Sequence, residues 1–367
     1  MTKAEFNAAL RRKLDGISEA DRKSILDYYD ECINDRMDDG ASEEEAVAAL
    51  GSVDELAAAV LADTPVTGLI PHVTERRTNN SGFAPESAQV IEQDFFNVDV
   101  ELTACDVRFV RSEDGICRVA FDGSKRFGLP VVTVRGNRLI VRNEARSIKW
   151  IDRITGWLED SGERLVIVFL PAREYGDLRV QLDSGDCELT PDLQFMTADL
   201  RSKSGDVICA GRIRDTLRIE TMSGDVKLER FACEGELILK SNSGDVEAKA
   251  IRCGSIRVNT ISGDLDIEEL ISAQAELHTI SGDLDVESAA VTGYLRAQTV
   301  SGDLDLGCRD AGSVNLITVS GDINARFAQQ MQFTASTVSG DVRIPTSNPY
   351  GKPCAIKTVS GDITVRA

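Results

Sequence analysis

The stretch TISGDLDIEELISAQAELHTISGDLDVESAAVTGYLRAQTVSGDLDL, residues 260–306, contains the tripeptide Ser-Gly-Asp three times, at intervals of 19 and 20 residues. The same tripeptide occurs ten times between Ser184 and Asp362, with gaps of 19 to 21 residues. A period near 20 residues indicates a solenoid, in which each repeat stacks on its neighbours and has few other contacts.

Each repeat contains the signals of two short strands. After the Asp, apolar and polar residues alternate, as in Leu265-Asp266-Ile267 and Leu284-Asp285-Val286, which is typical of a strand with one buried face. A second strand lies in mid-repeat, as in Leu295-Arg296-Ala297. Helical periodicity is absent within a repeat, which excludes leucine-rich and ankyrin arrays. The sequence therefore predicts a mainly β, single-chain β-helix with rungs of about 19–20 residues.

The glycine of each tripeptide is predicted to form the turn between strands. Glycine adopts positive φ without penalty, so the chain can turn where a Cβ atom would clash. Serine and threonine hydroxyls near the turn are expected to stack on their copies in adjacent rungs. The predicted structural turns are at Gly205, Gly224, Gly244, Gly263, Gly282, Gly302, Gly321, Gly340 and Gly361.

The aspartate of the tripeptide has two interpretations. In the first, each carboxylate accepts backbone amides within its own turn. In the second, the column is a ladder of cation sites, because hard cations bind several carboxylate oxygens. Calcium-binding β-rolls have a nine-residue repeat, which this chain lacks, so we favour the structural role and expect neither metal nor cofactor. The candidate ladder comprises Asp206, Asp225, Asp245, Asp264, Asp283, Asp303, Asp322 and Asp341.

The chain before the repeats differs in character. Residues 1–63 are predicted to form a small, all-α helical domain with 7 basic and 16 acidic residues. Its first helix begins with a capping box, Thr2-Lys3-Ala4-Glu5, and places Phe6, Leu10 and Leu14 on one face. Residues 64–90, rich in Pro, Gly, Ser and Asn, are predicted to be a linker. The β-helix domain then covers 91–367, with irregular rungs and a cap in 91–180 and regular rungs in 181–367.

Residues 144–158 interrupt the β pattern with helical spacing and contain Trp150 and Trp157. One interpretation is a helix that caps the N-terminal end of the solenoid, which we favour because that end needs a cover. The alternative is an amphipathic helix that contacts a membrane surface, where Trp, Lys and Arg are common.

Composition restricts the function. A formal charge of −20 argues against nucleic-acid binding, which needs a basic face. The nine cysteines include no CxxC pair, and only two histidines are present. The N-terminus has no secretory signal, and the longest strongly apolar stretch, Val166–Leu170, is too short to span a bilayer. We therefore expect a cytoplasmic protein, with membrane association through the two tryptophans as the alternative.

Two stretches resemble known bacterial families. Residues 2–63, with KAEF and YYDECINDRMDDGASEEEAVAALGS, resemble the HAAS-type helical domain of signalling and membrane-associated proteins. Residues from about 91 onward, with LVIVFLP and the TVSGD-type rungs, resemble the putative-adhesin β-strand-repeat family of unknown function. The resemblance implies a right-handed coil and a role in signalling or the envelope-stress response. The small, helical and acidic character of residues 1–63 favours a protein partner for that domain. Neither family implies catalytic residues.

The sequence leaves three functions to consider. The first is a non-enzymatic, adhesin-like binding or scaffold protein. The second is self-assembly, because Ile363–Ala367 ends the chain inside a strand and an open rung favours a homo-oligomer, unless Arg343, Arg366 or the insert Pro345–Pro353 shields it. The third, a carbohydrate-active enzyme, needs uniquely placed carboxylates, whereas these Asp residues recur in every rung. We therefore expect no enzymatic activity.

Overall fold

A computed structural model describes residues 2–14, 26, 33, 42, 43, 47, 53, 88–122, 130–143 and 164–366. The chain divides into two compact units, one of residues 1–82 with 149–159 and one of residues 83–148 with 160–367. The predictions for Trp150 and Trp157 lie outside the described residues. No helix in the described part of the chain is long and apolar enough to cross a membrane.

The helical unit contains α1 (Lys3–Lys13), whose start is the predicted capping box. The Thr2 N–H donates to Glu5 Oε2 at 3.0 Å, and the Glu5 N–H donates to Thr2 Oγ1 at 3.3 Å. These two bonds satisfy amides that have no partner within the helix. The predicted apolar face is confirmed, since the buried side chains of this unit include Phe6, Leu10 and Leu14, together with Ile33 and Val47.

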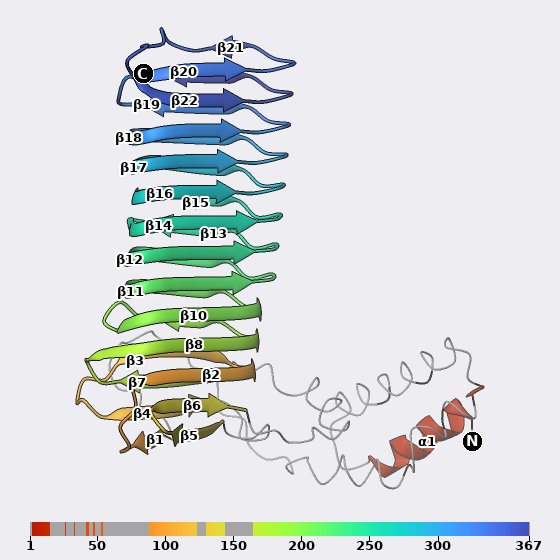
Figure 1. Cartoon of the computed structure of the whole chain (residues 1–367). Helices are drawn as coiled ribbons and strands as arrows, with labels where there is room; N and C mark the ends of the chain where they lie inside the picture. Colours follow the sequence, from red (N-terminus) through yellow and green to blue (C-terminus); the bar gives the residue numbers. More distant parts are fainter. Residues whose placement is uncertain are drawn as a thin grey trace, which may run out of the picture. The chain divides into compact units, whose positions relative to one another are not determined.

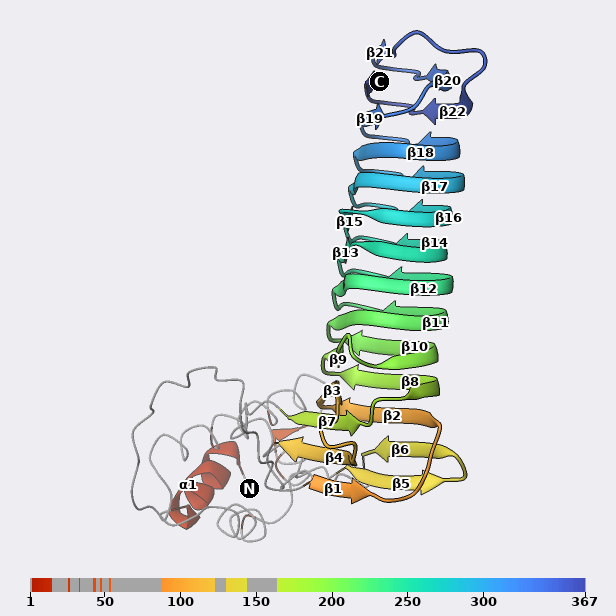
Figure 2. The same ribbon diagram turned by 90° about the vertical axis from the view of Figure 1, so that its left-hand side faces the viewer.

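The second unit is the predicted β-solenoid, a single sheet of 23 strands coiled into stacked rungs among the described residues. Figures 1 and 2 show the rungs stacked along one axis. The first strands are β1 (Ala88–Ile91), β2 (Asn97–Ala104), β3 (Asp106–Arg111), β4 (Cys117–Asp122), β5 (Val131–Arg135), β6 (Arg138–Arg142) and β7 (Leu165–Leu170).

The central strands are β8 (Glu174–Ser184), β9 (Cys187–Leu189), β10 (Gln194–Ser204), β11 (Val207–Thr221), β12 (Val226–Ser241), β13 (Val246–Lys249), β14 (Ile251–Thr260), β15 (Leu265–Ile267), β16 (Leu270–His278), β17 (Leu284–Gln298), β18 (Leu304–Ile317) and β19 (Ile323–Phe327). The last four are β20 (Met331–Ser336), β21 (Val342–Arg343), β22 (Lys352–Lys357) and β23 (Ile363–Arg366). Some rungs have two strands, whereas in others one long strand, such as β12, continues around the rung and pairs with both β13 and β14. Neighbouring rungs pair in parallel with equivalent residues in register, as Leu265 with Leu284. The alternating apolar residues fill the core, where Leu265 and Ile267 are buried.

The C-terminal rungs do not stack in chain order. β22 lies between β18 and β20, and β23 lies between β19 and β21. The outermost rung is therefore β20 with β21, and the expectation that Ile363–Ala367 forms the open end is wrong. The rings of Phe327 and Phe333 pack edge to face at 5.5 Å near this end, beside the small side chain of Cys354, which pairs with Phe333.

The N-terminal end shows the same exchange. β2 lies between β6 and β8, and β3 lies between β7 and β9, so the first rung lies inside the second. The stack ends here in antiparallel pairs, β1 with β4, β4 with β7, and β5 with β6. β1 begins at Ala88, so the last residues of the predicted linker are a strand.

Candidate functional site

The tripeptide glycines are required by close contact between rungs. A Cβ atom on Gly282 would lie 2.1 Å from the carbonyl oxygen of Gly263, far inside van der Waals contact. Positive φ, which the sequence analysis invoked, explains only Gly185, Gly340 and Gly361, with values from 134° to 154°. At the other seven tripeptides the rung below, and not the local turn, excludes a side chain.

The aspartate column links each rung to the next. The Asp283 N–H donates to Asp264 Oδ1, and the Asp303 N–H donates to Asp283 Oδ1, both at 2.8 Å. The amide comes from the adjacent rung, so the expected bond within the same turn is corrected. The carboxylate oxygen can accept this bond while the side chain remains exposed to solvent. The bond satisfies a backbone amide that has no acceptor within its own turn. Ten such bonds connect Asp106, Asp186, Asp206, Asp225, Asp245, Asp264, Asp283, Asp303, Asp322, Asp362 and Asp341 in spatial order.

The cation ladder receives no support from geometry. In the described part of the chain, no three His, Cys, Asp or Glu side chains are grouped so that they could hold a metal ion. A threonine ladder does form, because Thr279 and Thr299 are fully buried and Thr299 Oγ1 donates to the Gly282 carbonyl at 3.1 Å. The tripeptide serines Ser281 and Ser301 lie exposed at the same corner.

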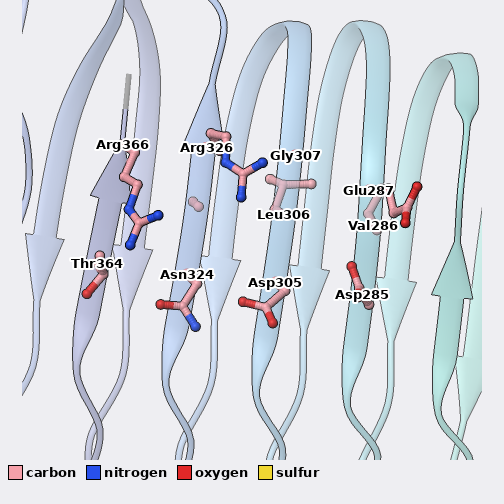
Figure 3. A pocket seen from close by; sticks show the side chains of 11 residues that line it. Asp285, Val286, Glu287, Asp305, Leu306, Gly307, Asn324, Arg326, Thr364 and Arg366 are labelled. Carbon is pink, nitrogen blue, oxygen red and sulfur yellow. The ribbon is translucent and has the colours of Figure 1, made fainter.

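A groove of about 680 Å³ crosses the outer face of β17, β18, β19 and β23 (Figure 3). Gly307 forms part of its floor, at the position in β18 that lies between Glu287 in β17 and Arg326 in β19. The interleaved order of the last rungs completes the groove, because it places Arg366 of β23 directly beside Arg326. If the rungs stacked in chain order, β21 would lie next to β19, and Arg366 would be one rung further from Arg326.

The groove is acidic on one side and basic on the other. Asp285 and Asp305 stack on adjacent rungs, with Glu287 beside them. Burial, and then repulsion by Asp305 and Asp266, raises the pKa of the Asp285 carboxyl. On the other side, Arg326 and Arg366 have no ion-pair partner within the described ranges (Figure 3). Each side therefore carries charge that has no ion-pair partner among the described residues.

A second groove, of about 450 Å³, differs in that its charges are already paired. Arg257 donates to Glu236 and to Glu276, both at 3.1 Å, and the Tyr294 hydroxyl donates to Glu276 at 2.9 Å. The bond from Arg257, and then that from Tyr294, lowers the pKa of Glu276. A ligand would have to break these bonds, so the first groove is the better candidate site.

Sequence reasoning missed an exposed apolar ladder. The residue before each tripeptide serine is mostly apolar, yet Ile261 is 46% exposed and Ile280 is 40% exposed. Alternation along the chain contains the signal, because the preceding threonine, such as Thr279, points into the core and the next residue must then point outward. Met222, Val319 and Val359 occupy the same column and are also exposed.

The cysteines are not arranged as nucleophiles. Burial raises the pKa of the Cys187 thiol to about 12 and that of Cys308 to about 11, and both thiols stay protonated at neutral pH. The eight cysteines that the structure describes are free thiols, and seven of them are buried. Cys32 lies outside the described residues.

Comparisons with known proteins agree with this architecture. Residues 96–234 and 208–366 match the family described as Toastrack DUF4097, and residues 5–59 match the HAAS family. Both resemblances noted in the sequence are thereby confirmed. No curated protein sequence matches the chain significantly.

Three solved structures are similar to this chain at low sequence identity. A "putative adhesin" from Bacteroides fragilis is 17% identical, with a TM-score of 0.39 over 76% of this chain and 96% of that one. A "putative lipid binding protein" from Parabacteroides distasonis is 15% identical, with a TM-score of 0.35 over 77% and 98%. A "putative cell adhesion protein" from Clostridium sporogenes is 9% identical, with a TM-score of 0.24 over 76% and 97%.

Proposed function

The chain belongs to the Toastrack DUF4097 family, and we propose that it is a non-enzymatic binding or scaffold protein that holds an acidic saccharide in the groove of Figure 3. One observation carries the proposal: Arg326 and Arg366 lie side by side without an ion-pair partner among the described residues, in the groove that Asp285 and Asp305 also line. An acidic sugar satisfies both sides at once.

The two sides of the groove suit different groups of such a ligand. Guanidinium groups form paired, charge-assisted hydrogen bonds with a carboxylate, which matches the basic side. The carboxylates of Asp285 and Asp305 accept hydrogen bonds from sugar hydroxyls. Asn324, between the two sides, both donates and accepts. Successive rungs lie about 4.8 Å apart, so the groove offers a new set of polar groups at each rung to a ligand that extends along the solenoid.

A binding role also fits the composition of the described groove. Its lining contains no His, Cys or Ser, and its carboxylates stand in columns that repeat along the stack. An elongated array in which each rung contacts only its neighbours presents an extended surface, which repeat proteins commonly use for binding.

Calorimetric titration with a tetrasaccharide of galacturonate tests the proposal directly. We expect binding by the full chain, and at least tenfold weaker binding by Arg326→Gln with Arg366→Gln. The control variant Arg252→Gln removes an exposed arginine outside the groove and should bind like the parent. The neutral tetrasaccharide of galactose should bind at least tenfold more weakly. If both sugars bound equally, or if the double variant bound as tightly as the parent, the groove would not be the saccharide site. Cleavage of the sugar would contradict a non-enzymatic role.

The helical unit supplies the second part of the proposal. Residues 5–59 match HAAS, and the predicted acidic, helical character of residues 1–63 suits a protein partner in bacterial signalling or the envelope-stress response. A two-hybrid screen with the full chain and with a chain lacking residues 1–63 tests this. Partners should be lost with the deletion, while saccharide binding should stay; partners that bind both chains equally would overturn this part alone.

A further inference from the structure

The outermost rung leaves a strand edge open at β21. In every other rung, the residue after the tripeptide Asp donates its N–H to the carbonyl of the Asp in the adjacent rung. Leu284 donates to Asp303 at 3.0 Å, and the series ends with Ile363, which donates to Asp341 at 2.8 Å. Val342 has no rung beyond it, so its N–H and C=O lack a backbone partner among the described residues. Such an edge readily pairs with another strand.

Core side chains are also uncovered at this edge. Val342 is 42% exposed and Ile344 is 37% exposed, although they occupy the apolar columns of the core. Their equivalents in the adjacent rung, Ile363 and Val365, are 0% and 7% exposed. Apolar side chains beside an open strand edge mark an interaction surface.

The other strand of the same rung is shielded. The Phe333 N–H donates to Ser347 Oγ at 2.8 Å, and the Asn348 N–H donates to the Met331 carbonyl at 3.1 Å. The insert that contains Ser347 and Asn348 was expected to shield the rung of Ile363–Ala367, but it covers the edge of β20 instead. Nothing similar covers β21 in the described residues, so the open edge of this rung is on the β21 side.

We propose that β21 pairs antiparallel with β21 of a second copy of this chain, centred on Val342. In such a pair the two central residues exchange both N–H···O bonds, which satisfies the open groups of each Val342. Asp341 then lies opposite Arg343 of the second copy, and Arg343 lies opposite its Asp341. The edge is thus self-complementary in charge as well as in hydrogen bonding, as a two-fold interface requires.

The existing contact between these two charges supports this arrangement. Arg343 already forms an ion pair with Asp341 at 2.9 Å within one chain, so both side chains lie on the same face at the edge. Antiparallel pairing would bring four charges of alternating sign together on that face. The resulting particle is a closed dimer of two solenoids joined at their C-terminal ends, not a filament.

Sedimentation equilibrium over a concentration series tests the proposal with charge exchange. We expect a reversible monomer–dimer equilibrium for the full chain. Arg343→Asp alone and Asp341→Arg alone should each weaken dimerisation at least tenfold, because like charges then face each other. An equimolar mixture of these two variants should dimerise within threefold of the parent, because every opposing pair is again Asp with Arg.

Controls separate this interface from misfolding and from other contacts. Arg252→Asp changes an exposed residue away from the edge and should leave the equilibrium unchanged. Thermal unfolding of each variant at a concentration where it is monomeric should match the parent within a few degrees. A chain that stays monomeric at high concentration, assembles beyond a dimer, or shows no recovery in the mixture would overturn the proposal. Saccharide binding by the variants should be unaffected, so the proposed ligand groove is tested independently.

Discussion

The middle of the solenoid and its two ends follow different rules. From β8 to β19 the rungs stack in chain order, whereas at both ends the terminal rung lies one place further in than its position in the chain. The contacts between rungs are nevertheless the same. The Asp362 N–H donates to Asp322 Oδ1 at 2.8 Å across the exchanged rungs, as the Asp283 N–H does to Asp264 in the middle.

This difference shows that the repeated contacts define how rungs stack but not which rung follows which. Glycine-to-carbonyl and Asp-to-amide contacts are identical in every rung, so they contribute equally to any order. The order at the ends must then depend on side chains that are not repeated. Phe327 and Phe333 at the C-terminal end are such residues.

A pair of engineered cysteines would decide the order of the last rungs and has the largest expected effect. Asn324 and Thr364 are directly paired on β19 and β23, while Arg343 is one rung further from Asn324. Adjacent parallel strands lie within disulfide range, and strands two rungs apart do not. Oxidation of Asn324→Cys with Thr364→Cys should therefore form a crosslink nearly completely.

The matched variant, Asn324→Cys with Arg343→Cys, should form almost none, as measured by mass spectrometry of proteolytic fragments. The native described thiols are nearly all buried, with pKa values raised by burial, so they should contribute little background. The reverse result would mean that the rungs stack in chain order and that the groove of Figure 3 lacks Arg366.

A methyl group in the glycine column should have the next largest effect. Gly282→Ala places a Cβ atom 2.1 Å from the Gly263 carbonyl oxygen, and only backbone movement can relieve that contact. We expect a loss of about 3 kcal/mol or more in the free energy of unfolding, from chemical denaturation. Gly136→Asn is the control: Gly136 has a φ of 61°, which Asn tolerates, and no atom within 4 Å of the added Cβ. A small effect at Gly282 would show that the rungs separate easily.

The sequence predicts the periodic part of this molecule well and the remainder poorly. The spacing of the tripeptide predicts the rungs, and alternation around Leu265 and Leu284 predicts the core, because a stack of equivalent rungs allows one solution for each repeat. The order of the end rungs is invisible, since equivalent rungs have equivalent sequences. The groove is missed for the same reason: Arg326 and Arg366 are 40 positions apart and become neighbours only through the exchange.

Removing an aspartate from the column should have a smaller effect on stability, and this effect should differ between a middle rung and the outermost rung. Asp264 accepts the amide of Asp283, whereas Asp341 has no rung beyond it to supply an amide. Asp264→Ala should reduce the free energy of unfolding by about 1 kcal/mol, because it leaves that amide without its acceptor. Asp341→Ala should cost less than about half as much in dilute monomer.

Asp264→Asn provides the matched control, because it keeps the acceptor oxygen and removes a charge. Its stability should be equal to the parent or slightly higher. If Asp264→Asn were as destabilising as Asp264→Ala, the charge itself, and hence a bound cation, would matter more than the hydrogen bond.

Neutralising a carboxylate that the repeat stacks on other rungs should have the smallest effect on the free energy of unfolding. The sign of this effect should depend on whether the neighbours of the carboxylate are acidic or are hydrogen-bond donors. Asp285 lies among carboxylates, and its raised pKa means that its contribution to stability is fully present below its unfolded pKa and is lost as pH rises through its folded pKa. Glu276 accepts bonds from Arg257 and Tyr294, and its lowered pKa means that its contribution is present above its unfolded pKa and is lost as pH falls through its folded pKa. Asp285→Asn should therefore raise the free energy of unfolding at pH 7, and Glu276→Gln should lower it, each by less than about 1 kcal/mol because solvent still reaches both carboxyl groups. Urea denaturation at pH 7 and again near pH 3 checks both signs, because each difference should shrink as the carboxyl groups of the parent become protonated. If Asp285→Asn were destabilising at pH 7, Asp285 would have a cationic partner within the stack, and the acidic side of the groove would not be free for a ligand.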